Sequence, residues 1–239
     1  MVSEAARSFH EKGYSVVDAF SAAEAAGYRE KILDLQARAG EEGKGDRWSL
    51  EHGVSITPVP LWSLITHEQI LAAVRDALKA CDVRYAEHSE VEVWRGCGHG
   101  GDRDPTGERA VAEGAWRPEY RVVRVACYFQ AAAEGFEWGA IAGSHRADPK
   151  PRPWTRRLGR RRHAPNVTWL ATKPTECILF DPRLIHIREP AAGATTVAAF
   201  LAFGVSNDYT LHHRNCFGRE DKNPYKLALA GYLTERGLA

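Results

Sequence analysis

The chain has 239 residues, of which 44% are hydrophobic, 26% charged and 10% aromatic, and these proportions argue against intrinsic disorder. Lys and Arg number 32 against 31 Asp and Glu, a formal net charge of +1, so no global field favours nucleic acid or a membrane as a partner. All-β domains of this length are routinely single, and one domain is therefore expected over residues 1–239.

Cysteine usage and the N-terminus indicate the compartment. The five cysteines are odd in number and form no CxxC pair, which fits reduced, buried thiols better than a disulfide framework. The first nine residues contain no apolar signal segment, and no stretch approaches the ~18 apolar residues of a membrane span. A cytoplasmic protein is expected.

The N-terminal third is predicted to be helical, apart from a strand after Gly13. Ser21 and Glu24 form a capping-box pattern ahead of a helix over Ala22–Arg38. Thr66 and Gln69 repeat that pattern before a second helix, which contains Ile70, Leu71, Val74 and Leu78.

From residue 83 onward, extended segments alternate with Gly/Pro turns, and a C-terminal helix is predicted over about Pro224–Arg236. Strands at this spacing after N-terminal helices predict a mainly β protein, a sandwich or barrel with helices packed outside. The predicted strands are Val83–Trp94, Tyr120–Gln130, Val167–Leu170, Cys177–Phe180 and Thr195–Val205.

The strand over Tyr120–Gln130 has two distinct faces. Period-2 alternation puts Val123, Val125, Cys127 and Phe129 on one face and Arg124 with Tyr128 on the other. If the second face lines the inside of a barrel, Arg124 could bind a carboxylate there. The opposite assignment, in which Arg124 is a solvent-exposed charge, is equally compatible with the pattern.

Two segments contain the residues that could bind a metal. The apolar run that starts at Cys177 leads through Asp181-Pro182-Arg183 to His186, and Gly98–Asp104 contains His99, Asp102 and Asp104. Two histidines and one carboxylate on one side of a metal, with the opposite positions open, is the arrangement of non-haem Fe(II) oxygenases.

Several pieces in the same order along the chain resemble the phytanoyl-CoA dioxygenase family. That resemblance implies a double-stranded β-helix, a jelly-roll, cupin-like fold, and an enzyme that uses Fe(II), 2-oxoglutarate and O2. It also implies that His186 is the distal metal histidine. The resembling pieces are Phe9–Asp18, Arg121–Gln130, Gly143-Ser144-His145 and Leu179–His186.

The proximal His-x-Asp pair of that family has no direct match. His99 and Asp102 are one residue too far apart, unless Gly100 and Gly101 allow a bulge that turns the carboxylate back toward the metal. His99, Asp102 and His186 are therefore the predicted metal ligands and catalytic residues, with Asp104 as the alternative carboxylate. Two other interpretations remain: a plain polar loop, or a halogenase-like His-x-Gly site.

The arginine that holds 2-oxoglutarate in the family is replaced by Thr196 in the matching stretch. A threonine cannot offer a carboxylate a charged, forked donor. Arg124, together with Tyr128, is the first predicted replacement, and Arg188 is the second because it follows His186 by two residues.

The segment Arg152–His163 is the strongest basic cluster. It is typical of a solvated loop, or it could bind an anionic or carrier-bound substrate. His145 is either a further metal ligand or a residue that stabilises its turn.

These features predict a non-haem Fe(II) oxygenase that hydroxylates or otherwise oxidises a small molecule with O2 and 2-oxoglutarate. The alternatives are an inactive family member acting as a binding subunit, a metal enzyme that does not use 2-oxoglutarate, and a basic binding module. Substrate identity and oligomeric state are not predicted.

Overall fold

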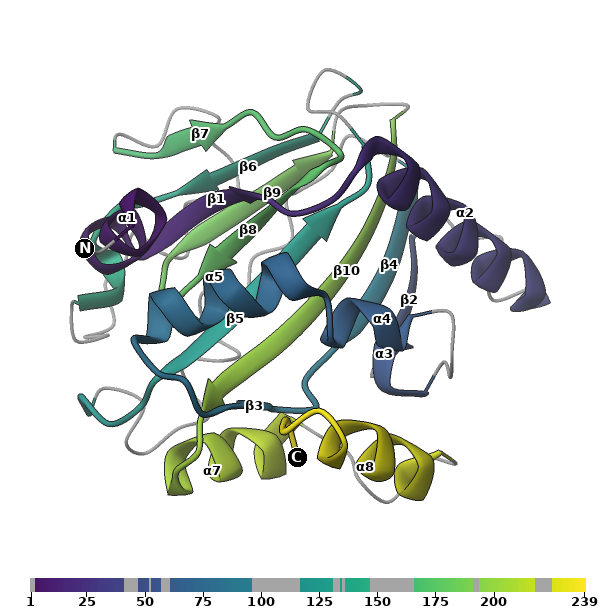
Figure 1. Cartoon of the computed structure of the whole chain (residues 1–239). Helices are drawn as coiled ribbons and strands as arrows, with labels where there is room; N and C mark the ends of the chain where they lie inside the picture. Colours follow the sequence, from purple (N-terminus) through teal and green to yellow (C-terminus); the bar gives the residue numbers. More distant parts are fainter. Residues whose placement is uncertain are drawn as a thin grey trace.

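A computed structural model describes residues 3–40, 47–51, 53–56, 61–95, 117–130, 134, 136–146, 166–190, 194–217 and 225–239. Two β-sheets face each other, with helices on the outer side of the larger one (Figure 1). Within the described ranges, none of the helices has the length and apolar character needed to cross a membrane.

The larger sheet is seven-stranded, with strand order β1-β8-β5-β10-β4-β2 and β3 paired to β10. Its longest strand, β10, runs antiparallel to both β5 and β4. The strands are β1 (Tyr14–Asp18), β2 (Arg47–Glu51), β3 (Val83–Tyr85), β4 (Glu90–Arg95), β5 (Val122–Tyr128), β8 (Glu176–Phe180) and β10 (Thr195–Val205).

The smaller sheet has three strands in the order β7-β6-β9, all antiparallel. They are β6 (Phe136–Ala140), β7 (Thr168–Leu170) and β9 (His186–Pro190). The space between the two sheets, called the lumen below, is filled by a cluster that includes Tyr128 of β5, Trp138 of β6 and Phe200 of β10.

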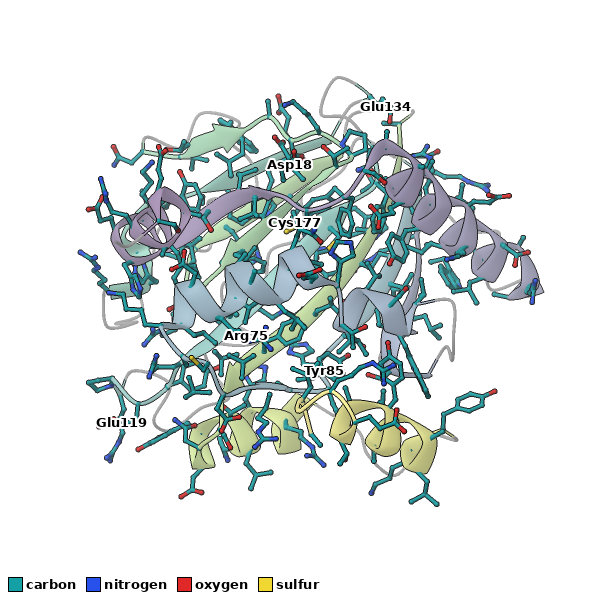
Figure 2. The ribbon with its side chains drawn as sticks, viewed as in Figure 1. Asp18, Arg75, Tyr85, Glu119, Glu134 and Cys177 are labelled. Atoms are coloured by element: carbon teal, nitrogen blue, oxygen red, sulfur yellow. The ribbon has the colours of Figure 1, made fainter. Side chains whose placement is uncertain are left out.

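Helices cover the other face of the larger sheet (Figure 1). Val123 and Val125 of β5 pack there against Ile70 and Val74, and Cys177 of β8, labelled in Figure 2, belongs to the same apolar core. The helices are α1 (Glu4–Lys12), α2 (Ala22–Arg38), α3 (Gly53–Ile56), α4 (Trp62–Ile65), α5 (Glu68–Leu78), the 3-10 turn η3 (Ser144–Arg146), α7 (Asp208–Phe217) and α8 (Lys226–Thr234).

The capping box predicted for α2 is confirmed. The Ser21 amide donates to Glu24 Oε2 over 2.8 Å, and the Glu24 amide donates to Ser21 Oγ over 3.2 Å. The second predicted capping box is wrong: α5 is capped by His67 without a side-chain hydrogen bond. The hydroxyl of Thr66 is instead hydrogen-bonded to the Tyr232 hydroxyl of α8 at 2.8 Å.

The predicted single strand over Val83–Trp94 is divided into β3 and β4. Glu87, which lies between them, has a φ of 51°, a left-handed conformation that cannot continue a strand. Its carboxylate pairs with Arg214 of α7 at 3.1 Å. The three described thiols, Cys81, Cys127 and Cys177, are free as expected; the last two are buried and Cys81 is exposed.

Candidate active site in the lumen

The predicted distal metal histidine, His186, lies at the start of β9. His186 lies opposite Ala140 of β6 in the smaller sheet. Its ring stacks on Trp138 with centroids 5.7 Å apart and contacts the ring of Phe180 at 4.7 Å. His186 Nδ1 lies 3.0 Å from the Leu184 carbonyl oxygen, which can only accept a hydrogen bond. Nδ1 therefore carries the proton, and the lone pair is on Nε2, the nitrogen that a metal would take.

The turn between β8 and β9 is fixed by several hydrogen bonds. The Asp181 carboxylate accepts from the backbone amide, Nε and Nη2 of Arg183, at 2.8, 2.8 and 2.6 Å. The Ile185 amide donates to Ser144 Oγ at 2.9 Å. The turn thus has a defined shape up to the residue before His186.

The predicted proximal ligands His99, Asp102 and Asp104 lie outside the described residues, as does the basic segment Arg152–His163. Within the described ranges, His, Cys, Asp and Glu side chains form no group of three that could hold a metal ion. Of the predicted ligands, the structure therefore describes His186.

The packing of β5 places Arg124 and Tyr128 on the lumen side, one of the two assignments that the alternation left open. Val123, Val125 and Cys127 pack with the helices, whereas Ala126 and Tyr128 belong to the lumen cluster. Arg124 is buried on the latter side, and its Nη1 lies 3.5 Å from the His88 carbonyl oxygen. It pairs in register with Ala202, six residues along β10 from Thr196.

An ion-pair network centred on the buried carboxylate of Glu92 connects the two sheets across the lumen. Arg188 of β9, in the smaller sheet, donates to Oε2 of Glu92 of β4, in the larger sheet, over 2.8 Å, and Arg47 donates to Oε1 over 3.0 Å. Glu92 is 1% exposed. Arg188 also lies over the rings of Trp94 and Phe200, 4.6 and 4.8 Å from their centroids. Arg188 belongs to β9, two residues after His186 on the same strand.

Thr196 lies at the same end of the lumen as this network. It is opposite Trp94 in register, and it is 1% exposed. Within the described residues, neither Thr196 Oγ1 nor Trp94 Nε1 has a hydrogen-bond partner although both atoms are buried. Buried donors normally have hydrogen-bond partners. The Thr196 hydroxyl and the Trp94 indole N–H could therefore donate to an acid bound at this end of the lumen.

Burial changes the ionisation of two further lumen groups. It raises the pKa of the Tyr128 phenol, although the nearby Arg188 acts in the opposite direction, so the phenol stays neutral. Burial, followed by the charge of Glu92, holds the pKa of Glu90 well above the usual range of a carboxyl group. Glu90, Glu92 and Trp94 were not predicted as site residues. Their alternation with Val91 and Val93 was the available signal.

Near Arg124, three side chains form a connected polar group. The Tyr120 hydroxyl lies 2.8 Å from His213 Nδ1, and His213 Nε2 lies 3.1 Å from His88 Nδ1. Burial, with Arg124 and His212 adding to it, lowers the pKa of His213 to about 3. His213 was also missed, because its partners come from distant parts of the chain.

The sequence matches no family model and no curated protein. Several solved structures have a fold similar to that of this chain. SnoK, a non-haem α-ketoglutarate-dependent carbocyclase of nogalamycin biosynthesis, is 14% identical with a TM-score of 0.68, covering 87% of this chain and 85% of its own. HygX from Streptomyces hygroscopicus, solved with nickel and 2-oxoglutarate, is 16% identical with a TM-score of 0.66, covering 86% and 88%.

AviO1 from Streptomyces viridochromogenes Tue57 is 13% identical with a TM-score of 0.65, covering 86% of this chain and 96% of its own. At these identities the similarity is one of fold. The predicted architecture is thereby confirmed: the chain has the double-stranded β-helix core seen in non-haem iron, 2-oxoglutarate-dependent enzymes.

Proposed function

We propose that the protein is a non-haem Fe(II)-dependent oxygenase that oxidises a small molecule. One observation carries this proposal: at the start of β9, His186 has Nδ1 committed to the Leu184 carbonyl, which leaves the lone pair on Nε2. The rings of Trp138 and Phe180 hold the imidazole in place and exclude water on their side. A fixed tautomer and a fixed ring orientation are the features expected of a metal-binding histidine.

We further propose His99 and Asp102 as the other two ligands, with Asp104 as the alternative carboxylate. Two histidines and one carboxylate suit Fe(II) and leave open positions. Iron held there would supply the activation of O2. The part of the protein would be to orient the substrate and to keep water from the reacting atoms.

The co-substrate in this proposal is 2-oxoglutarate, and HygX and SnoN, two proteins of the same fold, have been solved with it bound. The described residues fit such an acid at the Thr196 end of the lumen. Arg188 lies over the ring of Trp94, which is opposite Thr196 in register. Thr196 Oγ1 and Trp94 Nε1 are buried and have no hydrogen-bond partner among the described residues. Arg188 is therefore preferred over Arg124, which lies toward the His88 end.

A second candidate, a metal enzyme that does not use 2-oxoglutarate, is favoured by the Arg188–Glu92 ion pair. Glu92 already holds Arg188 at 2.8 Å. A 2-oxoglutarate carboxylate would have to share that guanidinium or displace Glu92 from it. If it cannot, Arg188 is a structural residue, and another small molecule or solvent completes the metal site.

The small-molecule class of substrate is supported by a fold neighbour: HygX has been solved with hygromycin B bound. An anionic or carrier-bound substrate remains a proposal linked to the basic segment Arg152–His163.

The test is Fe(II) binding without oxygen, measured by calorimetry for the wild type and for His186→Ala. We expect the variant to lose specific iron binding and to keep its fold, because His186 is only partly buried. The control is His212→Ala, which removes an exposed histidine of α7. Equal iron binding by His186→Ala and the wild type would refute the proposed site.

A further inference from the structure

A cavity of about 430 Å³ lies outside the lumen network, where α1, the C-terminal end of α5 and the start of β5 meet. Figure 1 shows these three elements converging on one side of the molecule. The turn after β8 and η3 complete its wall, through Asp181, Arg183, His145 and Arg146. Its volume is within the range of small-molecule sites.

The polar part of the cavity wall is positively charged. Arg121, Arg146 and Arg183 all line it. Arg183 is neutralised by its bidentate pairing with Asp181. Arg121 makes no side-chain hydrogen bond or ion pair with the described residues, and Arg146 donates to the backbone carbonyl of His10. Two guanidinium groups at this wall therefore have no carboxylate partner within the described part of the chain.

The charges converge on His10. Burial lowers the pKa of its imidazole, and the charges of Lys79, Arg121 and Arg146 lower it further, whereas Asp76 acts in the opposite direction. His10 Nε2 is buried and has no hydrogen-bond partner among the described residues. A buried imidazole nitrogen beside uncompensated cations is a site that an anion would stabilise.

The remaining wall is apolar. Phe9 of α1, Leu78 of α5 and Val122 of β5 line it, and all three are buried. A bare inorganic ion would leave this surface unused. A ligand with one acid group and a compact apolar body would use both walls.

We propose that this cavity binds a small organic anion, whose acid group contacts Arg121, Arg146 and His10 and whose apolar part packs on Phe9 and Leu78. Phosphate and carboxylate share the required chemistry. This site does not depend on a metal at His186, although Asp181 and Arg183 join its wall to the turn that leads to that residue.

The experiment is a calorimetric titration of the full chain with four probes at low salt: phenyl phosphate, benzoate, inorganic phosphate and benzyl alcohol. We expect phenyl phosphate or benzoate, or both, to bind at one site, more tightly than inorganic phosphate. Benzyl alcohol should show no binding. Whichever of the two organic anions binds more tightly identifies the acid. Affinity should fall as salt rises, since the cations are partly exposed.

Arg121→Gln should weaken binding of the tighter-binding organic anion roughly tenfold or more, because hydrogen bonds to charged groups are stronger than those between neutral groups. Arg38→Gln, at an exposed position of α2, is the matched control and should change nothing. His186→Ala should also bind as the wild type does, which separates this site from the proposed metal centre. If Arg121→Gln does not fold, Arg146→Gln, at an exposed position, decides in its place.

Three results would overturn the inference. One is the absence of binding by both organic anions at millimolar concentration. Another is organic-anion binding that is no tighter than that of inorganic phosphate. The third is an affinity that the arginine variants leave unchanged.

Discussion

Arg188 and Glu92 connect the two sheets: Nη1 of the arginine on β9 lies 2.8 Å from Oε2 of the glutamate on β4. Both side chains are largely removed from water. An ion pair in such a position gains little over apolar packing, but loss of one partner leaves a buried charge uncompensated. The pair should therefore be strongly coupled in stability measurements.

A double-mutant cycle tests that coupling. Arg188→Gln and Glu92→Gln should each lower the free energy of unfolding by about 3 kcal/mol. The double variant should lose clearly less unfolding free energy than the two single variants together, because neither position then carries an unpaired charge. Urea unfolding of the four proteins gives the coupling energy. Additive losses would mean that the two side chains act independently. Arg38→Gln, on the surface of α2, is the control for loss of an arginine.

Asp102 and Asp104, the two candidate carboxylates after His99, can be distinguished by their effect on iron affinity. If Gly100 and Gly101 form a bulge, Asp102→Ala should cost far more iron affinity than Asp104→Ala. Anaerobic Fe(II) titration of both variants measures the difference. The reverse order would make Asp104 the ligand and would argue against His99.

His213 should give stability a specific pH dependence. Its pKa is lowered to about 3 in the folded chain, against a usual value near 6.5, mainly because it is buried. Between these values the unfolded chain binds a proton that the folded chain does not. Stability should therefore fall as the pH is lowered from about 6.5 toward 3, by at most ~1.4 kcal/mol per pH unit from this group.

His213→Gln removes this contribution, so its unfolding free energy should depend less steeply on pH between 6 and 4. Absolute stability changes as well, since Tyr120 and His88 lose a partner, and the comparison therefore uses the slope alone. His212→Gln, on the exposed side of the same helix, should keep a slope close to that of the wild type, because burial is the largest cause of the lowered His213 pKa and His212 the smallest. If His213→Gln keeps it too, His213 is not the group responsible.

Gly13 is needed at the end of α1 for two reasons. Its φ is 89°, and a Cβ there would lie 2.4 Å from His145 Nδ1 and 2.7 Å from Leu184 Cδ1. Gly40 has a φ of 63°, and no atom of the described residues lies within 4 Å of its Cβ position. Gly40→Ala should cost about 1 kcal/mol from backbone strain alone. Gly13→Ala should cost at least twice as much in urea unfolding, and equal losses would contradict the packing argument.

One local feature of the sequence predicted its structure correctly, whereas the Thr66–Gln69 capping box did not form. The Ser21–Glu24 capping box fixed the start of α2, because both hydrogen bonds are made within four residues. Alternation separated the two faces of β5 correctly, but only the packing shows that one lies on the helices and the other toward the small sheet. The strand β9 was not predicted, and His186 begins it after the turn that follows β8.

The electrostatic organisation of the lumen could not be predicted in the same way. Glu92 and Arg188 are 96 residues apart and lie in different sheets, so no local pattern joins them. The same holds for Tyr120 and His213, which are 93 residues apart. Periodicity tells which face a side chain occupies, but the partner across a lumen depends on how the two sheets are placed.

The proposed co-substrate is tested by adding 2-oxoglutarate to the Fe(II)-loaded protein without oxygen and recording the weak visible charge-transfer band of the chelate. The wild type should show the band, and His186→Ala should not. The double variant Arg188→Gln/Glu92→Gln, which keeps the lumen charge balanced, should need roughly two to four orders of magnitude more 2-oxoglutarate. Arg124→Gln should bind it as the wild type does, and Thr196→Arg should bind it at least as tightly. Iron binding by the wild type with no band at millimolar 2-oxoglutarate would show that 2-oxoglutarate is not the co-substrate.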